Sequence, residues 1–271
     1  MRITGSRPRR AAIVVAAACI LPLAGCMHLG PLGGRATDES TKTYPLSAGG
    51  ELRIVNTNGR VDIQGIDGSA VEVRTVRIAR ATTDEAARQL LPRIRIHEDV
   101  TPDRISIETE RIGGLLIGAG FEVQYHVKTP KGATVNVTTT NGAVAMAELS
   151  GPVRARTTNG GITAKNLSGA VEARSTNGGV SVDVAQVGAG RIGLSTTNGS
   201  LTLALPENAK ADVSATWTNG GISVTGLNVD VSEHGRRRFD GKMNGGGTPV
   251  ELRTTNGGIR LKARAMAEAG Q

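Results

Sequence analysis

The residues of this sequence best suited to bind an anion are three consecutive arginines, Arg236, Arg237 and Arg238. A guanidinium group donates hydrogen bonds in a planar fork that matches the oxygens of a carboxylate or a phosphate. The three arginines lie in a stretch that interrupts a regular repeat. We therefore interpret this stretch as a solvated loop, and binding of phosphate or another anionic envelope group by the three arginines is the functional alternative.

Patterns that would indicate catalysis or metal binding are not found. No Gly-x-Ser-x-Gly elbow and no P-loop occurs. Acidic residues such as Glu172 and Asp183 are scattered among Lys and Arg and form no repeated cluster. The histidines do not have the short spacings of metal ligands; they are His28, His97, His126 and His234. We predict no catalytic, cofactor-binding or metal-binding residues.

The phrase Thr-Asn-Gly recurs along the chain at a nearly constant interval. Five copies are separated by 18, 18, 21 and 21 residues, and one further copy lies on each side of this block. An internal repeat of this length is typical of stacked repeat architectures. We predict that the asparagines form a structural ladder of turns; they are Asn58, Asn141, Asn159, Asn177, Asn198, Asn219 and Asn256.

The residues around each Asn-Gly alternate between apolar or small and polar, which indicates half-buried strands. Aligning the copies by their Asn produces apolar columns, of which one holds Val135, Val153 and Val171 and the next holds Val144, Ile162 and Val180. Asn-Gly also favours β-hairpins, so an antiparallel meander is the alternative. A hairpin does not require the same residues at constant spacing, whereas stacked turns do. We therefore predict an all-β, β-helix-like solenoid of stacked two-strand rungs.

The part of the chain before the block contains further alternating segments, at residues 51–55, 60–64 and 71–78, which we interpret as early rungs. One segment has a different pattern. Thr82 to Glu85 fits a capping box, and Ala86, Ala87, Leu90 and Leu91 form one apolar face. We predict a short helix at residues 83–91 that ends before Pro92 and caps the coil.

The first 25 residues have the composition of a secretory signal peptide. Four arginines precede an apolar run from Ala11 to Leu23, and small residues follow the run. The run is shorter than the roughly 20 residues of a spanning helix. Leu23-Ala24-Gly25-Cys26 resembles the bacterial lipoprotein box, in which the cysteine is acylated after cleavage. We predict lipidation of Cys26; an ordinary signal peptide is the alternative.

Cleavage before Cys26 would change the cysteine count and the net charge. Cys19 would leave with the signal peptide, so the folded part would have no thiol for a disulfide or a metal site. Loss of four basic residues lowers the formal charge from +8 to +4, which is too mild for a nucleic-acid-binding protein. Because Met27 rather than Asp follows the cysteine, the outer membrane is favoured, facing the periplasm or the surface.

These observations predict one folded domain with flexible ends. Residues 1–25 are the signal peptide, 26–43 a flexible tether, 44–264 the solenoid and 265–271 a disordered tail. The apolar, glycine-rich stretch at residues 112–120 is interpreted as a loop folded against the end of the coil, and an exposed apolar tip is the alternative.

Several segments together resemble the bacterial putative adhesin family, a domain of unknown function with a β-solenoid fold. They are the run from Phe121 to Pro130, Val135-Asn136-Val137, the Thr-Asn-Gly-Gly-Ile copies and the run from Val250 to Ile259. The likeness covers residues 43–264 and implies no catalytic residue and no cofactor. Together with the lipoprotein box at Cys26, it suggests a non-enzymatic, lipid-anchored envelope protein that binds envelope polysaccharide or another envelope protein. A structural or regulatory component of envelope stress is the alternative, and a polysaccharide-active enzyme is a weaker one.

Overall fold

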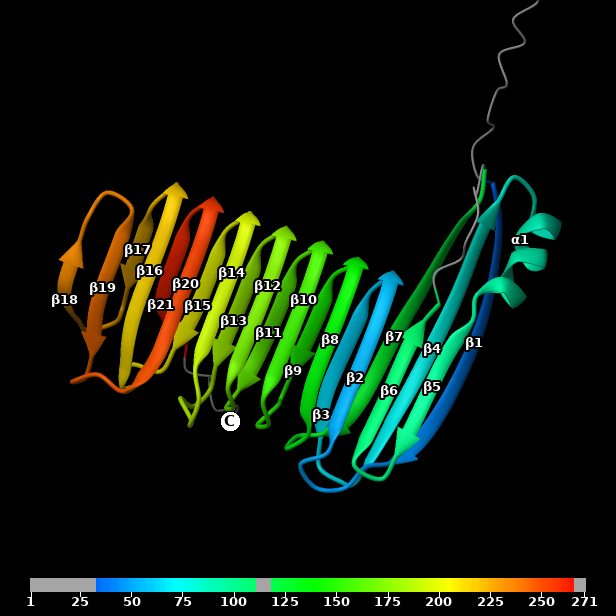
Figure 1. Cartoon of the computed structure of the whole chain (residues 1–271), viewed down its shortest axis with the longest axis horizontal. Helices are drawn as coiled ribbons and strands as arrows, with labels where there is room; N and C mark the ends of the chain where they lie inside the picture. The colour runs from blue at the N-terminus through cyan, green and yellow to red at the C-terminus, as the bar shows by residue number, and fades with distance from the viewer. Residues whose placement is uncertain (1–32, 111–117, 266–271) are drawn as a thin grey trace, which may run out of the picture.

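The computed structural model describes residues 33–110 and 118–265, most of which lie in β-strands. The strands form two long sheets, a first sheet of ten strands and a second sheet of eleven. Figure 1 shows an elongated stack in which the chain passes repeatedly between the two layers. Most buried aliphatic side chains form one continuous core. The predicted all-β solenoid is confirmed.

Seven turns of the chain, which we call rungs, share one plan. In each rung a strand of the second sheet ends at Asn, and after the Gly turn a strand of the first sheet follows. In spatial order the rungs are β2 (Glu51–Asn58) with β3 (Val61–Ile66), β8 (Thr134–Asn141) with β9 (Val144–Ala147), β10 (Val153–Asn159) with β11 (Ile162–Leu167), β12 (Val171–Asn177) with β13 (Val180–Val184), β14 (Ile192–Asn198) with β15 (Leu201–Leu205), β20 (Thr248–Asn256) with β21 (Ile259–Ala263), and β16 (Ala211–Asn219) with β17 (Ile222–Thr225).

Equivalent strands of successive rungs pair in parallel, and equivalent residues are in register. Val153 lies between Val135 and Val171 in the second sheet, and Ile162 lies between Val144 and Val180 in the first. All of these side chains are buried, whereas the alternate positions face solvent. A meander would pair consecutive strands in antiparallel fashion. The meander is therefore wrong, and the predicted columns are confirmed.

The rungs do not follow sequence order at the far end of the coil. Strand β20 lies between β14 and β16, and β21 lies between β15 and β17. Figure 1 shows the red strands β20 and β21 inserted among yellow and orange strands that precede them in the sequence. The chain thus forms the terminal rung β16/β17 first. It then passes through β18 (Val229–His234) and β19 (Arg238–Met243) and returns to fill the gap.

Further strands extend both sheets at the N-terminal end and the second sheet at the other end, and the outermost pairs are antiparallel. At the N-terminal end the first sheet continues through β7 (Gly120–Pro130), β4 (Ala70–Ala81) and β1 (Gly34–Pro45), and the second through β6 (Arg104–Thr109) and β5 (Ile96–Thr101). The interpretation of residues 51–55 and 60–64 as an early rung is confirmed. That of 71–78 is wrong, because β4 pairs antiparallel with both β1 and β7. Strands β18 and β19 close the other end of the second sheet.

The predicted helix forms, but its limits differ from those expected. Helix α1 spans Asp84–Leu90, and the Thr83 hydroxyl accepts a hydrogen bond from the Ala86 amide. The cap is therefore Thr83 rather than Thr82, so the expected capping box with Glu85 is not in register. The α-helix ends before Pro92, as predicted, and Pro92 lies in the 3₁₀ turn that follows, η1 (Leu91–Arg93), where its missing amide costs little. Ala87 packs with Ala36 and Ala81, which places α1 beside β1 and β4 (Figure 1).

The predicted tether at residues 26–43 is also corrected. Strand β1 begins at Gly34 and pairs with β4 along its whole length, because its polar side chains find partners such as Arg74 for Glu39 and Arg77 for Asp38. Residues 26–32 lie outside the described residues, as do Cys26, most of the glycine-rich stretch and the tail from residue 266. Arg264 still contacts the coil, through an ion pair with Asp183.

Candidate functional site

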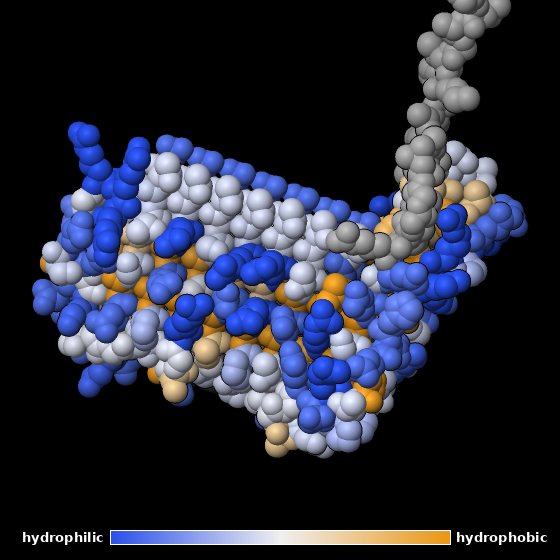
Figure 2. Space-filling view, viewed as in Figure 1, coloured by the Kyte–Doolittle hydropathy of each residue, from blue (hydrophilic) through white to orange (hydrophobic). Residues whose placement is uncertain are grey.

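One edge of the coil carries a continuous ladder of asparagine side chains. Each Nδ2 donates to the Oδ1 of the neighbouring Asn on the side of Asn58, at 2.7–2.8 Å, so seven residues are joined by six hydrogen bonds. Asn256 lies between Asn198 and Asn219, as the rung order requires. Figure 2 shows this edge as an even row of hydrophilic residues along the stack. The predicted ladder is confirmed. The position of Asn256 between Asn198 and Asn219 was not predicted.

The corner beneath the ladder leaves no room for side chains. A Cβ atom on the glycine that follows each ladder Asn would lie less than 3.0 Å from the carbonyl oxygen of the glycine in the adjacent rung. This applies to Gly142, Gly160, Gly178, Gly199, Gly220 and Gly257. Buried hydroxyls of Thr157, Ser175, Thr196 and Thr254 donate to the same row of carbonyls. The glycine of each phrase and the hydroxyl residue that precedes the phrase are therefore packing requirements of the corner, and we looked for a binding site on the outer faces.

The outer face of the second sheet is hollowed above strand β14. The outward position of β14 at Gly193 is in register with Glu172 on β12 and Glu251 on β20. Since Gly193 has no side chain, the larger residues on both sides enclose a depression of about 440 Å³. Ser195 extends its floor, and Ser214 and Thr216 of β16 lie on the far side. We call this depression the Gly193 slot.

Four arginines line the Gly193 slot, together with the two glutamates. They are Arg174, Arg191, Arg238 and Arg253. Their guanidinium groups leave the lining with a formal charge of +2, since the glutamates are the acidic residues among those that line it. The slot is thus a basic, hydroxyl-rich depression on an open face, which suits a polar anionic ligand.

Glu172 holds part of this arginine cluster in place. Its carboxylate lies 3.0 Å from Arg154, 2.8 Å from Arg174 and 3.8 Å from Arg191. Partial burial favours the neutral acid, but the three arginines outweigh it and keep the pKa of the Glu172 carboxyl below its usual value. Glu172 is therefore charged at neutral pH and fixes the orientation of the guanidinium groups at one wall.

The structure separates the three arginines that the sequence put together. Arg238 begins β19, lines the Gly193 slot and pairs with Asp240 and Glu233. Arg236 and Arg237 are exposed in the turn before β19 and do not line the slot. Of this possible anion-binding triplet, one residue thus belongs to a larger arginine cluster, and the other two lie in an exposed turn.

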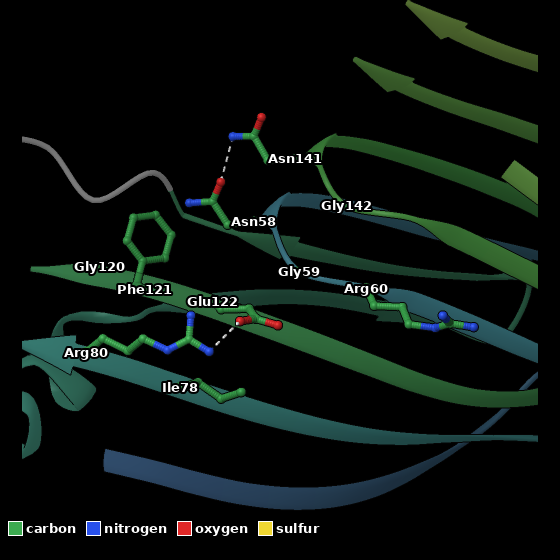
Figure 3. Close-up of a pocket in the computed structure, with 10 residues that line it drawn as sticks. All are labelled: Asn58, Gly59, Arg60, Ile78, Arg80, Gly120, Phe121, Glu122, Asn141 and Gly142. Carbon is green, nitrogen blue, oxygen red and sulfur yellow. Dashed lines mark hydrogen bonds and ion pairs between the residues drawn. The ribbon is translucent and has the colours of Figure 1, made fainter. Parts of the chain in front are cut away.

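A second concavity lies where the ladder meets the N-terminal strands. It has a volume of about 420 Å³ and is bounded by Asn58, Asn141, Ile78 and Phe121. Figure 3 shows Phe121 beside the two ladder asparagines, and Arg80 pairs with Glu122 at 3.6 Å below it. Arg60 also lines this concavity but pairs with Asp62, so both arginines here have an acidic partner and fewer cationic groups are available to an anion than in the Gly193 slot.

The slot was missed from the sequence, although a signal for it exists. When the copies are aligned by Asn, Gly193 is the one glycine in an outward column that otherwise holds Arg53, Asn136, Arg154, Glu172, Ser214 and Glu251. Within the described residues no group of three or more His, Cys, Asp or Glu side chains is arranged to hold a metal ion. None of the helices in residues 33–110 and 118–265 is long and apolar enough to span a membrane.

Solved structures with a similar arrangement come from other bacteria and share little sequence with this chain. A putative cell adhesion protein from Clostridium sporogenes is 12% identical, with 84% of this chain and 100% of that chain covered and a TM-score of 0.49. A putative adhesin from Bacteroides fragilis is 11% identical, with coverage of 84% and 97% and a TM-score of 0.43. No curated protein matches the chain.

The family model described as Toastrack DUF4097 matches residues 41–262, which include all seven rungs. The match begins within β1 and ends within β21, so it covers the coil and the N-terminal strands that close it. The chain belongs to the Toastrack DUF4097 family.

Proposed function

We propose that this protein is a non-enzymatic, lipid-anchored envelope protein that acts as an adhesin or binding module. The observation that carries the proposal is the outer face of the second sheet. There, seven in-register rungs present polar side chains in regular rows, and the rows are interrupted by one basic, hydroxyl-rich slot. Such a surface can meet an extended envelope glycan or protein along its length.

The anchor in this proposal is Cys26, which lies outside the described residues. The leader and the Leu23-Ala24-Gly25-Cys26 motif support it. Each buried CH₂ group of an acyl chain contributes about 0.8 kcal/mol, so two or three chains hold a protein on a membrane durably. The outer membrane remains the proposed location, with the coil facing the periplasm or the surface.

Replacing Cys26 by Ser should move the protein from the membrane fraction to the soluble fraction, because serine cannot carry the thioether-linked lipid. Fractionation of cells that produce each variant measures this. Cys19→Ser is the matched control and should remain in the membrane fraction, since Cys19 is expected to leave with the signal peptide. A Cys26→Ser protein that stays membrane-bound, or a native protein whose mass shows an intact residue 1, would contradict the anchor.

The binding function is tested by pull-down from cell envelopes with the purified protein, followed by identification of retained glycan and protein. We expect a retained envelope component that free competitor glycan or protein displaces. If nothing is retained, while deletion of the gene changes the expression of envelope-stress genes, the binding proposal is wrong and the regulatory alternative replaces it.

A further inference from the structure

We propose that the Gly193 slot binds an acidic saccharide, that is, sugar rings that carry carboxylate or phosphate groups. The inference rests on the proposed binding function and specifies its site and its ligand class. Three observations carry it: an unneeded glycine at the centre of a strand, an arginine without an ionic partner, and hydroxyl and carboxylate groups placed beside the cationic ones.

Gly193 is not required by the fold. Its φ lies outside the left-handed region that favours glycine, and a Cβ atom built on it meets no atom within 4 Å. Other glycines inside strands differ, because a Cβ on Gly65 or Gly241 would lie less than 3.0 Å from neighbouring atoms. Glycine weakens a strand, and the close approach of a ligand is one of the reasons for which a strand contains it.

Not every arginine that lines the slot has an acidic partner within the described part of the protein. Arg174 and Arg191 share Glu172, and Arg238 pairs with Asp240. Among the described residues, Arg253 forms no ion pair, although it projects from β20 at the position in register with Ser195. Arg174 occupies the same position on β12. Two guanidinium groups therefore flank a one-strand gap of small residues, where an anionic group can accept hydrogen bonds from both sides.

The remaining lining groups favour a saccharide over other polyanions. Ser195, Ser214 and Thr216 can donate to or accept from sugar hydroxyls, and Glu251 can only accept when it is charged. A carboxylate at this place repels a uniformly charged phosphate chain but binds the hydroxyl groups of a sugar. No aromatic side chain lines the slot, whereas binding of single-stranded nucleic acid relies on base stacking.

The test is titration calorimetry of the purified protein with three oligosaccharides of equal length: oligogalacturonate, which carries carboxylates, a phosphorylated oligosaccharide, and a neutral oligoglucose. We expect binding of at least one acidic probe and none of the neutral one. The two acidic arms distinguish a uronate from a sugar phosphate as the natural source of the anionic group.

Gly193→Val should weaken binding of the acidic probe at least 10-fold, because its side chain occupies the floor of the slot. It should leave the melting temperature unchanged or raise it by a few degrees, since a β-branched residue suits an open strand position. This combination separates the slot from a structural effect, which would lower both affinity and melting temperature.

Arg253→Gln should also weaken binding about 10-fold or more, in line with the loss of a hydrogen bond to a charged group. Arg156→Gln is the matched control. Arg156 lies on the neighbouring strand β10, where it is exposed on the same face and in register with Arg174 of β12, but it does not line the slot. Its replacement should change affinity less than 2-fold.

Three results would each contradict a binding site at the slot. They are failure to bind either acidic probe, an equal loss of affinity in Arg156→Gln and Arg253→Gln, and full affinity in Gly193→Val. Retention of an envelope component by Gly193→Val and by the native protein alike would overturn the slot while leaving the proposed function intact. Binding of the acidic probe at the slot without retention of any envelope component would overturn the proposed function alone.

Discussion

Gly160→Ala is expected to destabilise the whole coil by about 3 kcal/mol. The new Cβ would lie less than 3.0 Å from the carbonyl carbon and oxygen of Gly142 in the adjacent rung, and both are backbone atoms. Relief of this clash requires two rungs to separate at the corner, where Asn159 bonds to Asn141 and Asn177. For a domain of this size the loss corresponds to a fall in melting temperature of roughly 6–12 °C.

The control for this substitution is Gly221→Ala, in the turn of the terminal rung. A Cβ on Gly221 meets no atom within 4 Å, and alanine restricts the unfolded chain more than glycine does. Its melting temperature should equal that of the native chain or exceed it slightly. Thermal unfolding followed by circular dichroism compares the two variants, and equal melting temperatures would show that the corner does not require glycine.

Asn56→Ala should cost about 3 kcal/mol, because it removes a buried side chain that makes four hydrogen bonds. Its Nδ2 donates to the carbonyl oxygens of Gly59 and Val123, and its Oδ1 accepts from Thr57 and Thr109. These bonds join the first rung to β7 and β6, which close the N-terminal end. Loss of Asn56 leaves buried carbonyl groups without donors at this junction.

The hydrogen bonds near Asn56 differ from those at the equivalent position of the next rung, which is Thr139. Asn56 is in register with Thr139 and donates to the Gly59 carbonyl, whereas the buried Oγ1 of Thr139 has no hydrogen-bond partner. Thr109 continues the network to the hydroxyl of Tyr125, and burial raises the pKa of Tyr125 to about 12, so the phenol keeps its proton. The network therefore stays intact across neutral pH.

Urea unfolding of Asn56→Ala beside Asn159→Ala measures this effect. Asn159 lies in the exposed ladder, where water replaces lost hydrogen bonds, and its replacement should cost less than about 1 kcal/mol. A cost for Asn56→Ala no larger than that for Asn159→Ala would show that the junction is not held by this network.

The repeat made the coil predictable from the sequence, whereas the strands at the ends of the coil could not be predicted. Regular spacing places Val135, Val153 and Val171 in one column, because parallel stacking requires equivalent residues to coincide. Strand β4 has the same alternation as a rung strand, so period alone could not reveal its antiparallel pairing. Strand β1 has a polar composition that resembles a linker, and only its partners on β4 make it a strand.

The candidate site was partly hidden for a related reason. Arg236 to Arg238 stand out because they are adjacent in the sequence, yet only Arg238 reaches the slot. Arg174 and Arg253 are far apart in the chain, and they flank the slot because β20 returns to lie beside β14. The order of the strands in the sequence does not indicate this return. Strands β16 and β17 precede β20 and β21 in the sequence, but β20 and β21 lie between them and the preceding rung.

The order of the rungs is the central claim, and disulfide trapping tests it most directly. In a Cys19→Ser, Cys26→Ser background, cysteines at positions 198 and 256 would lie on adjacent parallel strands, about 4.8 Å apart, within the Cα range of a disulfide. Cysteines at positions 198 and 219 would be two strands apart, at roughly 9.6 Å, which is too far. We predict rapid cross-linking of Asn198→Cys with Asn256→Cys and none of Asn198→Cys with Asn219→Cys under mild oxidation. Cross-linking of the second pair instead of the first would contradict the inserted rung and, with it, the assembly of the Gly193 slot.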